Sequence, residues 1–444
     1  MIFFIKNIYF FEKTNTLKVI VRQKYRAIIL TYDKNDVHLR KQYIMKIIPL
    51  TPNTGGILHP DQVIGRNLNV SEMIEILKRQ SINLNAFRRS GKSSLLAKLN
   101  KSLEEKDDFV SIYLEVEGIS NCDSFIEKLY QKFKDEEIIE ENAIQKIDKA
   151  FDNLLGRFSK IGLPGFSAEL NKRRQLWEKQ LDELLKAVIK SNPNKLVIIS
   201  LDEFSIMLDK IEDKGEASEL IGILRATMHN EPFKESIRFI YCGSIGIDLV
   251  LDKLKKAGNN IGQPLNTMYD YVLEPLTSDN ALYLARCFDL GCDLKLSEEN
   301  MIYICELSEN IPYYIDFIFS LIRYKPRPSI DKDTIQQAYL SMLNDSNDKA
   351  EFKHFYERIT LHYPEKDTSL SILNFLSKNT QPKTETDILN HISTQKETTR
   401  QSLIDELDRL RTDDYLSRET IEDERTYKFK YEILRMWWKL NKSF

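Results

Sequence analysis

The stretch Asn83–Lys98, NLNAFRRSGKSSLLAK, constrains the fold more than any other part of the chain. An apolar lead-in is followed by a polar turn and then by Gly-Lys-Ser-Ser, which runs into a segment of helical spacing. The residues at 86–93, AFRRSGKS, match a phosphate-binding loop with alanine in place of the usual first glycine. The backbone N–H groups of such a loop, and of the helix that follows, cradle phosphate oxygens. The stretch therefore predicts a strand, a P-loop and a helix that bind a nucleotide.

Each position of this loop has an expected role. Gly91 lets the backbone approach the phosphates, Lys92 reaches the β and γ phosphates, and Ser93 can coordinate Mg²⁺. Ala86 is small enough for the first glycine position, although alanine cannot take every glycine conformation. The residues expected to contact the nucleotide here are Ala86, Arg88, Arg89, Ser90, Gly91, Lys92, Ser93 and Ser94.

A second motif at 194–204, NKLVIISLDEF, supplies the acidic partner that a P-loop requires. Its nearly continuous apolar run is typical of a central strand in a parallel sheet, since both faces of that strand are buried. Ligands bind at the carboxyl ends of such strands. We expect Asp202 to hold Mg²⁺ through water, and Glu203 to activate the attacking water as a general base.

Ser244 follows another apolar run, SIRFIYCG, which predicts a neighbouring buried strand. At the tip of that strand Ser244 is placed to contact the γ-phosphate or the attacking water. The alternative is an ordinary turn residue after Gly243. With Ser244 included, the expected catalytic residues are Lys92, Glu203 and Ser244.

The alternation of strands and helices predicts an α/β fold, a P-loop NTPase parallel sheet with helices on both faces. From Thr277 onward the spacing of Leu, Ile, Phe and Tyr is helical, which predicts an all-α lid. A small hairpin is expected at Ile161–Phe166, around Gly-Leu-Pro-Gly. We expect four regions: a basic extension at 1–48, the P-loop core at 49–275, the lid at 276–345 and a last domain at 346–444.

Composition narrows the class of protein. With 444 residues, 42% of them hydrophobic and 30% charged, the chain is globular and too long for a single core. A net charge of −3 gives no overall attraction to nucleic acid or to anionic membranes. The five cysteines form no CxxC pair and the six histidines are scattered, which fits a reducing compartment and disfavours zinc. No apolar stretch is long enough to span a bilayer, so we expect a cytoplasmic protein with no membrane contact.

Residues 1–48 differ from the rest, with ten Lys and Arg against three acids. Alternation in Leu17–Tyr32 predicts a hairpin. Two readings stay open. The segment is either a basic, aromatic arm that contacts nucleic acid or a partner, or a loosely ordered extension upstream of a start at Met45.

The last domain shows three helical segments, at 368–377, 385–391 and 396–412, followed by two alternating strands. This order predicts a winged helix-turn-helix, whose third helix would read DNA. The candidate DNA contacts are Lys396, Thr398, Thr399, Arg400, Gln401, Ser402, Arg418, Arg425 and Lys428. However, the segment from Glu351 to Phe444 carries 16 Lys and Arg against 17 Asp and Glu, and a neutral domain neutralises few phosphates. DNA contact and protein docking therefore both remain open.

From about Pro60 to Phe444, the chain resembles the prokaryotic AAA+/STAND-type P-loop ATPases, an archaeal-type ATPase-like family with a C-terminal winged helix. The two phosphate motifs, the box at 63–66 (VIGR) and the winged helix carry the resemblance, and Arg-Arg-Ser-Gly-Lys-Ser is similar to the family's Arg-Arg-x-Gly-Lys-Thr. The resemblance implies that Val63, Ile64 and Arg66 contact the base and ribose. It also implies that Ser244 is the first sensor.

The same resemblance bears on the lid and on assembly. Asn310-Ile311-Pro312 is similar to the family's Gly-x-Pro lid motif, with Asn310 in place of glycine, which implies that Pro312 lines the nucleotide site. No second-sensor arginine is evident. Arg225 or Arg238 is the candidate for an arginine finger that enters a neighbouring subunit, which would require a homo-oligomer.

These observations predict a Mg²⁺-dependent ATPase that binds ATP or ADP and acts as a switch on its winged helix. One alternative is a nucleotide-gated scaffold that binds without hydrolysis and acts through protein contacts. Another is a DNA-binding ATPase of mobile-element or phage-defence biology.

Overall fold

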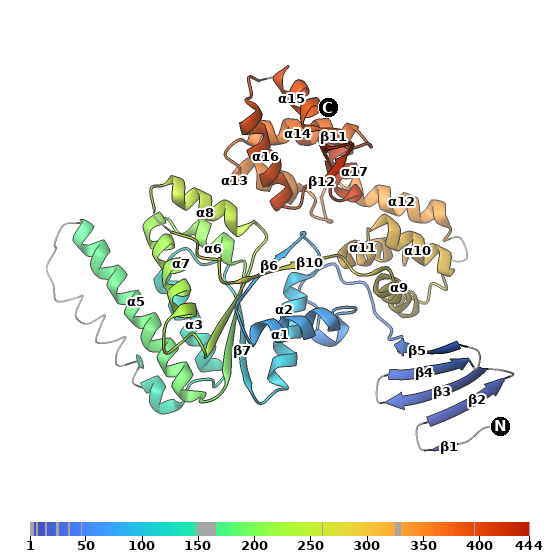
Figure 1. The fold of residues 1–444 in the computed structure, drawn as a ribbon, viewed down its shortest axis with the longest axis horizontal. Coiled ribbons are helices and arrows are strands. Elements are labelled where there is room, and N and C mark those ends of the chain that lie inside the picture. Colours follow the sequence, from blue (N-terminus) through green and yellow to red (C-terminus); the bar gives the residue numbers. More distant parts are fainter. Residues whose placement is uncertain are drawn as a thin grey trace.

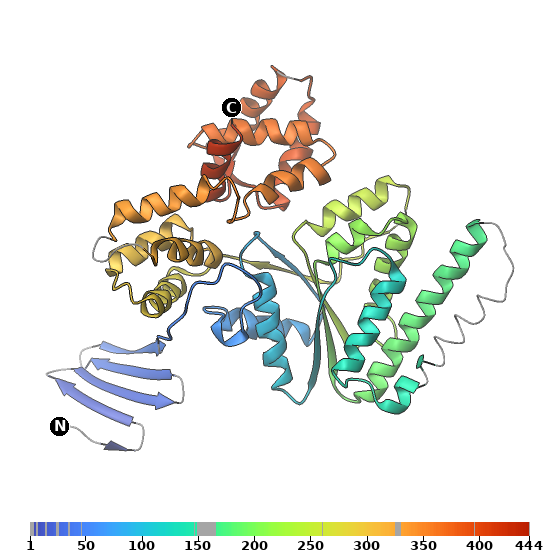
Figure 2. The ribbon, with the colours of Figure 1, turned by 180° about the vertical axis from the view of Figure 1, so that it is seen from behind.

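The computed structural model describes residues 47–145, 147–148, 166–259, 261–324, 330–394 and 396–443, together with five strands within residues 4–45. A P-loop core, a helical lid and a C-terminal module follow one another along the chain (Figure 1). Seen from behind, the C-terminal module again lies above the other two, over the end of the sheet at which the P-loop leaves its strand (Figure 2). No helix among the described residues is both long enough and apolar enough to cross a bilayer.

The core is built on a parallel sheet of five strands in the order β10-β6-β9-β8-β7. Both β8 and β9 are buried almost throughout, which explains their uninterrupted apolar sequences. The predicted strands are confirmed. They are β6 (Ile82–Ala86), β7 (Phe109–Glu115), β8 (Leu196–Asp202), β9 (Ile237–Cys242) and β10 (Tyr269–Leu273).

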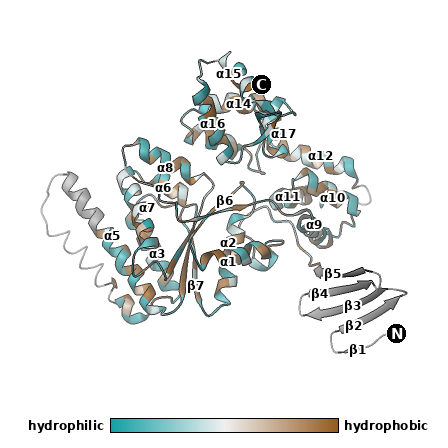
Figure 3. Cartoon of the chain, in the orientation of Figure 1, coloured by the Kyte–Doolittle hydropathy of each residue, from teal (hydrophilic) through white to brown (hydrophobic). Residues whose placement is uncertain are grey.

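Helices cover both faces of this sheet, as predicted, and Figure 3 shows apolar residues concentrated where sheet and helices meet. One face carries α1 (Asn67–Leu77) and α2 (Lys92–Glu104). The other carries α3 (Cys122–Asp135), α5 (Phe166–Ser191), α6 (Phe204–Lys210), α7 (Lys214–His229) and α8 (Ile247–Lys256). Of the hairpin expected at 161–166, residues 161–165 lie outside the described part of the chain. Phe166 is the first residue of α5. A short 3-10 helix, η1 (Pro60–Gln62), precedes α1.

The expected helical lid is present. It consists of α9 (Ser278–Cys292), α10 (Glu298–Leu307), α11 (Pro312–Ile322) and α12 (Lys332–Leu343). Pro312 occupies the first turn of α11. Backbone N–H groups in the first turn of a helix have no intrahelical acceptor, so proline, which lacks an N–H, is tolerated there.

After a first helix, the C-terminal module has the order of elements predicted for a winged helix: three further helices, then a hairpin whose partner strands are β12 and β13. The short strand β11 adds a third strand to the hairpin. The elements are α13 (Lys353–His362), α14 (Lys366–Lys378), β11 (Lys383–Thr384), α15 (Glu385–Ser393), α16 (Arg400–Thr412), β12 (Leu416–Ile421), β13 (Glu424–Phe429) and α17 (Glu432–Asn441).

The third of these helices starts later than predicted. We expected it from Lys396, but α16 begins at Arg400, because the Thr399 side chain accepts the Ser402 N–H at 3.2 Å and caps the helix. Lys396 and Thr398 therefore precede the helix that they were expected to open.

The lid and the C-terminal module share one hydrophobic core. Trp437 and Trp438 are buried in it, together with residues from all four lid helices. Leu50, from the segment before η1, and Phe87, from the P-loop, belong to the same core. The lid, the module and the nucleotide loop are therefore packed as one unit.

Residues 4–45 contain an antiparallel meander of five strands. The hairpin predicted in Leu17–Tyr32 is confirmed as the β3–β4 pair, in which Leu17 faces Tyr32. The strands are β1 (Phe4–Ile5), β2 (Ile8–Lys13), β3 (Thr16–Gln23), β4 (Arg26–Asp33) and β5 (Asp36–Met45).

Candidate active site

The predicted P-loop connects the end of β6 to the start of α2. Gly91 precedes the helix with a φ of 87°, a left-handed conformation that glycine adopts without strain. Ser90 tightens the turn, since its N–H and its hydroxyl both donate to the Phe87 carbonyl, at 3.2 and 2.5 Å. The positive end of the α2 dipole therefore faces the loop, as anion binding requires.

The loop lysine is buried and has few hydrogen-bond partners. Lys92 is only 8% exposed. Within the described part of the chain, the one hydrogen bond of its ammonium is a long one, 3.4 Å, to the Ala86 carbonyl. A buried ammonium with one weak partner fits a site in which phosphate oxygens complete its shell.

The acidic motif converges on this loop. Tyr113, on β7, donates to Oδ2 of Asp202 at 2.7 Å, and its hydroxyl lies within electrostatic reach of Ser93. Cys242, at the end of β9, lies within electrostatic reach of Lys92 and Asp202, and burial raises the pKa of its thiol. Ser93 and Asp202 thus both lie near the hydroxyl of Tyr113. A hydroxyl and a carboxylate in this arrangement are suited to Mg²⁺, which favours oxygen ligands.

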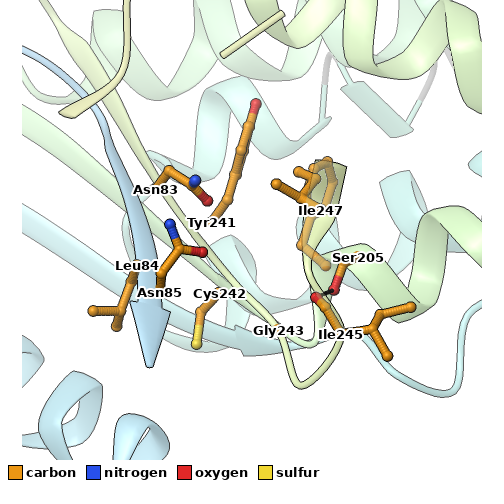
Figure 4. A pocket seen from close by; sticks show the side chains of 10 residues that line it. Asn83, Leu84, Asn85, Ser205, Tyr241, Cys242, Gly243, Ile245 and Ile247 are labelled. Carbon is orange, nitrogen blue, oxygen red and sulfur yellow. Dashed lines mark hydrogen bonds between the residues drawn. The ribbon is translucent and has the colours of Figure 1, made fainter. Parts of the chain in front are cut away.

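Glu203 follows β8 in a left-handed conformation, with a φ of 59°. Its Oε2 accepts the backbone N–H of Ser244 at 2.7 Å, so the predicted base and the predicted sensor are in contact. The Ser205 hydroxyl holds the same loop by donating to the Ile245 carbonyl at 2.7 Å (Figure 4). A Cβ at Gly243 would lie 2.0 Å from that hydroxyl, which explains the glycine.

A small hollow lies beside these strand ends. Figure 4 shows the amide side chains of Asn83 and Asn85 and the ring of Tyr241 around it, on the α6 side of the sheet. The hollow adjoins Gly243 and is part of the same end of the sheet as Glu203 and Ser244.

The two loop arginines face the C-terminal module. Arg89 forms an ion pair with Glu351, and Arg88 Nη2 lies 3.5 Å from the same carboxylate. The Arg89 guanidinium also lies 4.6 Å from the ring centroid of Tyr313, on α11. The P-loop is therefore tied to both the lid and the module.

The residues assigned to base and ribose lie next to the loop. Arg66 is buried, and its guanidinium donates to the carbonyls of Glu274 and Ser90 at 2.9 and 3.1 Å, so that it ties β10 to the P-loop. Burial lowers the pKa of Arg66 to about 10. The Val63 carbonyl accepts from Lys98 at 2.5 Å, and Ile64 packs against the lid core.

The remaining candidates are spread around this centre. The Ser94 hydroxyl accepts the Leu58 N–H at 3.3 Å and so anchors the segment that leads to η1. Arg238, one of the two arginine-finger candidates, is buried at the amino end of β9 and donates to its neighbouring carbonyl of Ile237 at 2.9 Å. Arg238 therefore lies at the opposite end of β9 from Ser244, which follows the carboxyl end of that strand.

Sequence reasoning missed Arg358, on α13. Its guanidinium donates to the Ser244 carbonyl through Nη2 and to the Asp413 carbonyl through Nη1, the latter at 3.2 Å. No local motif could identify it, because 114 positions separate it from Ser244. Tyr113 was also missed, because a tyrosine in a strand predicts only burial.

No family model and no curated protein matches the chain. Solved structures match it instead. The Walker-type ATPase of Pyrococcus abyssi has a TM-score of 0.57 at 15% identity, over 87% of this chain and 98% of that one. The ORC2 protein of Aeropyrum pernix, solved in ADPNP-ADP complexes, has a TM-score of 0.53 at 12% identity, over 85% and 92% of the two chains. At such identities the likeness establishes the fold, which is that of Walker-type ATPases.

Proposed function

We propose that the protein binds Mg²⁺-ATP and hydrolyses it, and that the nucleotide controls the docking of a C-terminal winged helix. One observation carries the proposal. The hydroxyl of Tyr113 donates to Asp202, at the end of β8, and lies within electrostatic reach of Ser93, at the start of the P-loop helix. The sheet thus brings the lysine-bearing loop and the acidic pair to one place, although more than 100 residues separate them in the sequence.

The residues have distinct tasks in this proposal. Lys92 and the N–H groups at the start of α2 hold the β and γ phosphates. Ser93 and Asp202 would hold Mg²⁺, which supplies neutralisation of phosphate charge when bound. Glu203 takes the proton of the attacking water, and Ser244 holds the Glu203 carboxylate through its N–H.

In this proposal, the docked C-terminal module is the part of the chain that responds to the nucleotide. We propose domain limits of 1–48, 49–275, 276–345 and 346–444, with the last domain acting as a winged helix. Arg88 and Arg89, which flank the phosphate position in sequence, pair with Glu351 at the start of the module. A change in the charge of the nucleotide bound by the loop would therefore change the ion pairs between the loop and the module.

A protein partner is favoured over DNA for the exposed side of the module. Each candidate DNA contact with a full charge is paired with a carboxylate of the module itself. The pairs are Lys396–Glu365, Arg400–Glu385, Arg418–Asp408, Arg425–Glu385 and Lys428–Glu419. Cations already neutralised in this way release few counterions from DNA.

The test compares Lys92→Ala with Lys101→Ala, a substitution on the exposed side of the same helix. We expect Lys92→Ala to weaken the binding of a fluorescent ATP analogue by at least about tenfold, as loss of a buried charge-assisted contact implies. Lys101→Ala should bind as the wild type does, because Lys101 pairs with Asp61 away from the loop. Equal binding by the wild type and Lys92→Ala would refute the proposal.

Phosphate release from the wild type separates hydrolysis from binding alone. Release that depends on Mg²⁺ and is lost in Lys92→Ala supports the ATPase. Tight binding without release would identify the nucleotide-gated scaffold instead.

A further inference from the structure

Three residues form a continuous hydrogen-bonded path from the C-terminal module to the predicted catalytic base. The guanidinium of Arg358 donates to the carbonyl of Ser244. The N–H of Ser244 in turn donates to Oε2 of Glu203, at 2.7 Å. The backbone carbonyl of Ser244 is thus hydrogen-bonded to the module, and its N–H is hydrogen-bonded to Glu203.

The loop that carries Ser244 has few other supports. The Ser205 hydroxyl fixes it at Ile245. At Gly246, an added Cβ would lie 2.4 Å from Oδ1 of Asp413, so the module also closes over the end of the loop. The loop is thus held on one side by α6 and on the other by the module.

Arg358 itself is well oriented within the module. Its second donor reaches the Asp413 carbonyl at 3.2 Å, and its guanidinium lies 5.7 Å from the ring centroid of Tyr415. The carboxylate of Asp413 accepts from the Tyr363 hydroxyl at 2.5 Å. The guanidinium is therefore held by groups of its own module before it meets the Ser244 carbonyl, so docking delivers it in a fixed orientation.

Charge adds to this arrangement. Arg88 of the P-loop lies within electrostatic reach of both Arg358 and Glu203. Burial lowers the pKa of Arg88, and the positive charge of Arg358 lowers it further, whereas Glu203 opposes the shift. The guanidiniums of Arg88 and Arg358 therefore both lie near the end of the sheet that carries Glu203.

We propose that Arg358 is a positioning residue for hydrolysis, supplied by the C-terminal module, which orients Glu203 through the peptide of Ser244. This inference rests on the ATPase function proposed above. It makes turnover depend on the docked state of the module, and it gives the chain its own arginine at the site without a neighbouring subunit.

The test separates nucleotide binding from the hydrolysis step. The variants are Arg358→Ala, Arg358→Lys and, as the matched control, His362→Ala. His362 lies on the same helix and also contacts the core, with Nδ1 2.9 Å from Oδ2 of Asp209, but it does not contact the path to Glu203. For each variant, single-turnover hydrolysis and the Kd for ATP are measured, and limited proteolysis reports whether the module stays docked.

We expect Arg358→Ala to slow single-turnover hydrolysis about 10- to 100-fold, the range for a lost orienting contact, while its Kd for ATP changes less than about threefold. Arg358→Lys should recover part of the rate, because an ammonium can still donate to one carbonyl. His362→Ala should hydrolyse ATP within about twofold of the wild type, since the catalytic path is intact.

Other outcomes overturn the inference in distinguishable ways. If Arg358→Ala hydrolyses ATP as fast as the wild type, Arg358 positions nothing. If Arg358→Ala and His362→Ala lose rate equally and become equally sensitive to protease, the arginine acts only by docking the module. If the wild type hydrolyses no faster than Lys92→Ala, the ATPase proposal itself fails, and this inference fails with it.

Discussion

The ring of Phe87, in the P-loop, packs against the ring of Tyr431, next to α17, with the ring centroids 4.1 Å apart. Phe355, on α13, also stacks on Phe87, with the two ring centroids 5.0 Å apart. Phe87 is only 2% exposed. A residue of the nucleotide loop is thus part of the core of the C-terminal module, so the conformation of the loop and the docking of the module are coupled.

Phe87→Ala should therefore undock the module. Removal of a buried phenylalanine costs about 3–5 kcal/mol, here from the free energy that holds the module to the P-loop core. We expect faster proteolysis between the lid and the module, and an earlier unfolding transition in tryptophan fluorescence, because Trp437 and Trp438 lie in the shared core. Phe87→Leu is the control and should retain most of the stability, since it keeps most of the apolar volume. Unchanged protease resistance in Phe87→Ala would contradict the coupling.

The ion pairs of Glu351 suggest a competition between the module and the nucleotide for the loop arginines. Glu351→Gln removes the carboxylate that neutralises Arg88 and Arg89. We expect the affinity for ATP to rise by a factor of about two to five, the effect of a partly exposed ion pair. Glu357→Gln, on the exposed side of the neighbouring helix α13, should leave the Kd unchanged. A weaker affinity in Glu351→Gln would show that the carboxylate supports the loop instead of competing with the phosphates.

Asp316, on α11, predicts a pH dependence of lid stability. It is 6% exposed, Oδ2 accepts the Asn53 N–H at 3.0 Å, and Oδ1 has no partner within the described ranges. Burial raises the pKa of Asp316 to about 6. Between its ordinary value of 3.8 and about 6, the folded chain binds more protons at this site than the unfolded chain, so the free energy of unfolding falls as the pH rises.

Asp316→Asn removes this titration and keeps an acceptor for Asn53. We expect the variant to be more stable than the wild type at pH 8, by up to about 3 kcal/mol, and to lose this advantage at pH 4. Thermal unfolding at both pH values measures the difference. Asp333→Asn, an exposed change on α12, serves as the control. Equal pH dependence in the wild type and Asp316→Asn would contradict the raised pKa.

The exposed face of the module offers a further prediction. Glu385 lies 3.4 Å from Arg400 and 3.7 Å from Arg425, two of the candidate DNA contacts. If carboxylates mask this face, Glu385→Gln should raise the affinity for duplex DNA and steepen its dependence on salt, whereas the wild type should bind weakly. Titrations at two salt concentrations provide the measurement. Tight, strongly salt-dependent binding by the wild type would instead establish DNA as the partner.

The parts predictable from sequence are those that local patterns determine. The apolar runs that became β8 and β9 are unmistakable because both faces of these strands are buried. Gly91 and Lys92 could be placed because a phosphate loop fixes residue types at fixed spacing. The start of α16 was misplaced by four residues, because a Thr399 cap and an earlier start at Lys396 are both compatible with the helical spacing.

The rest depends on the docking of one region on another. Arg358 on an amphipathic helix looks like an ordinary exposed cation, and only the seating of α13 against the loop after β9 brings it to Ser244. Phe87 likewise reads as one residue of a P-loop until Tyr431 packs on it. Contacts of this kind have no signature in sequence spacing, since they arise from tertiary packing.

In the proposed mechanism, the carboxylate of Glu203 activates water for attack on a bound ATP. The most direct test is single-turnover phosphate release by Glu203→Gln, measured beside its affinity for Mg²⁺-ATP. The amide keeps an acceptor for the Ser244 N–H but cannot take a proton, so we predict wild-type affinity and a rate lowered by at least about 100-fold. A variant that binds ATP and hydrolyses it at the wild-type rate would rule out Glu203 as the general base.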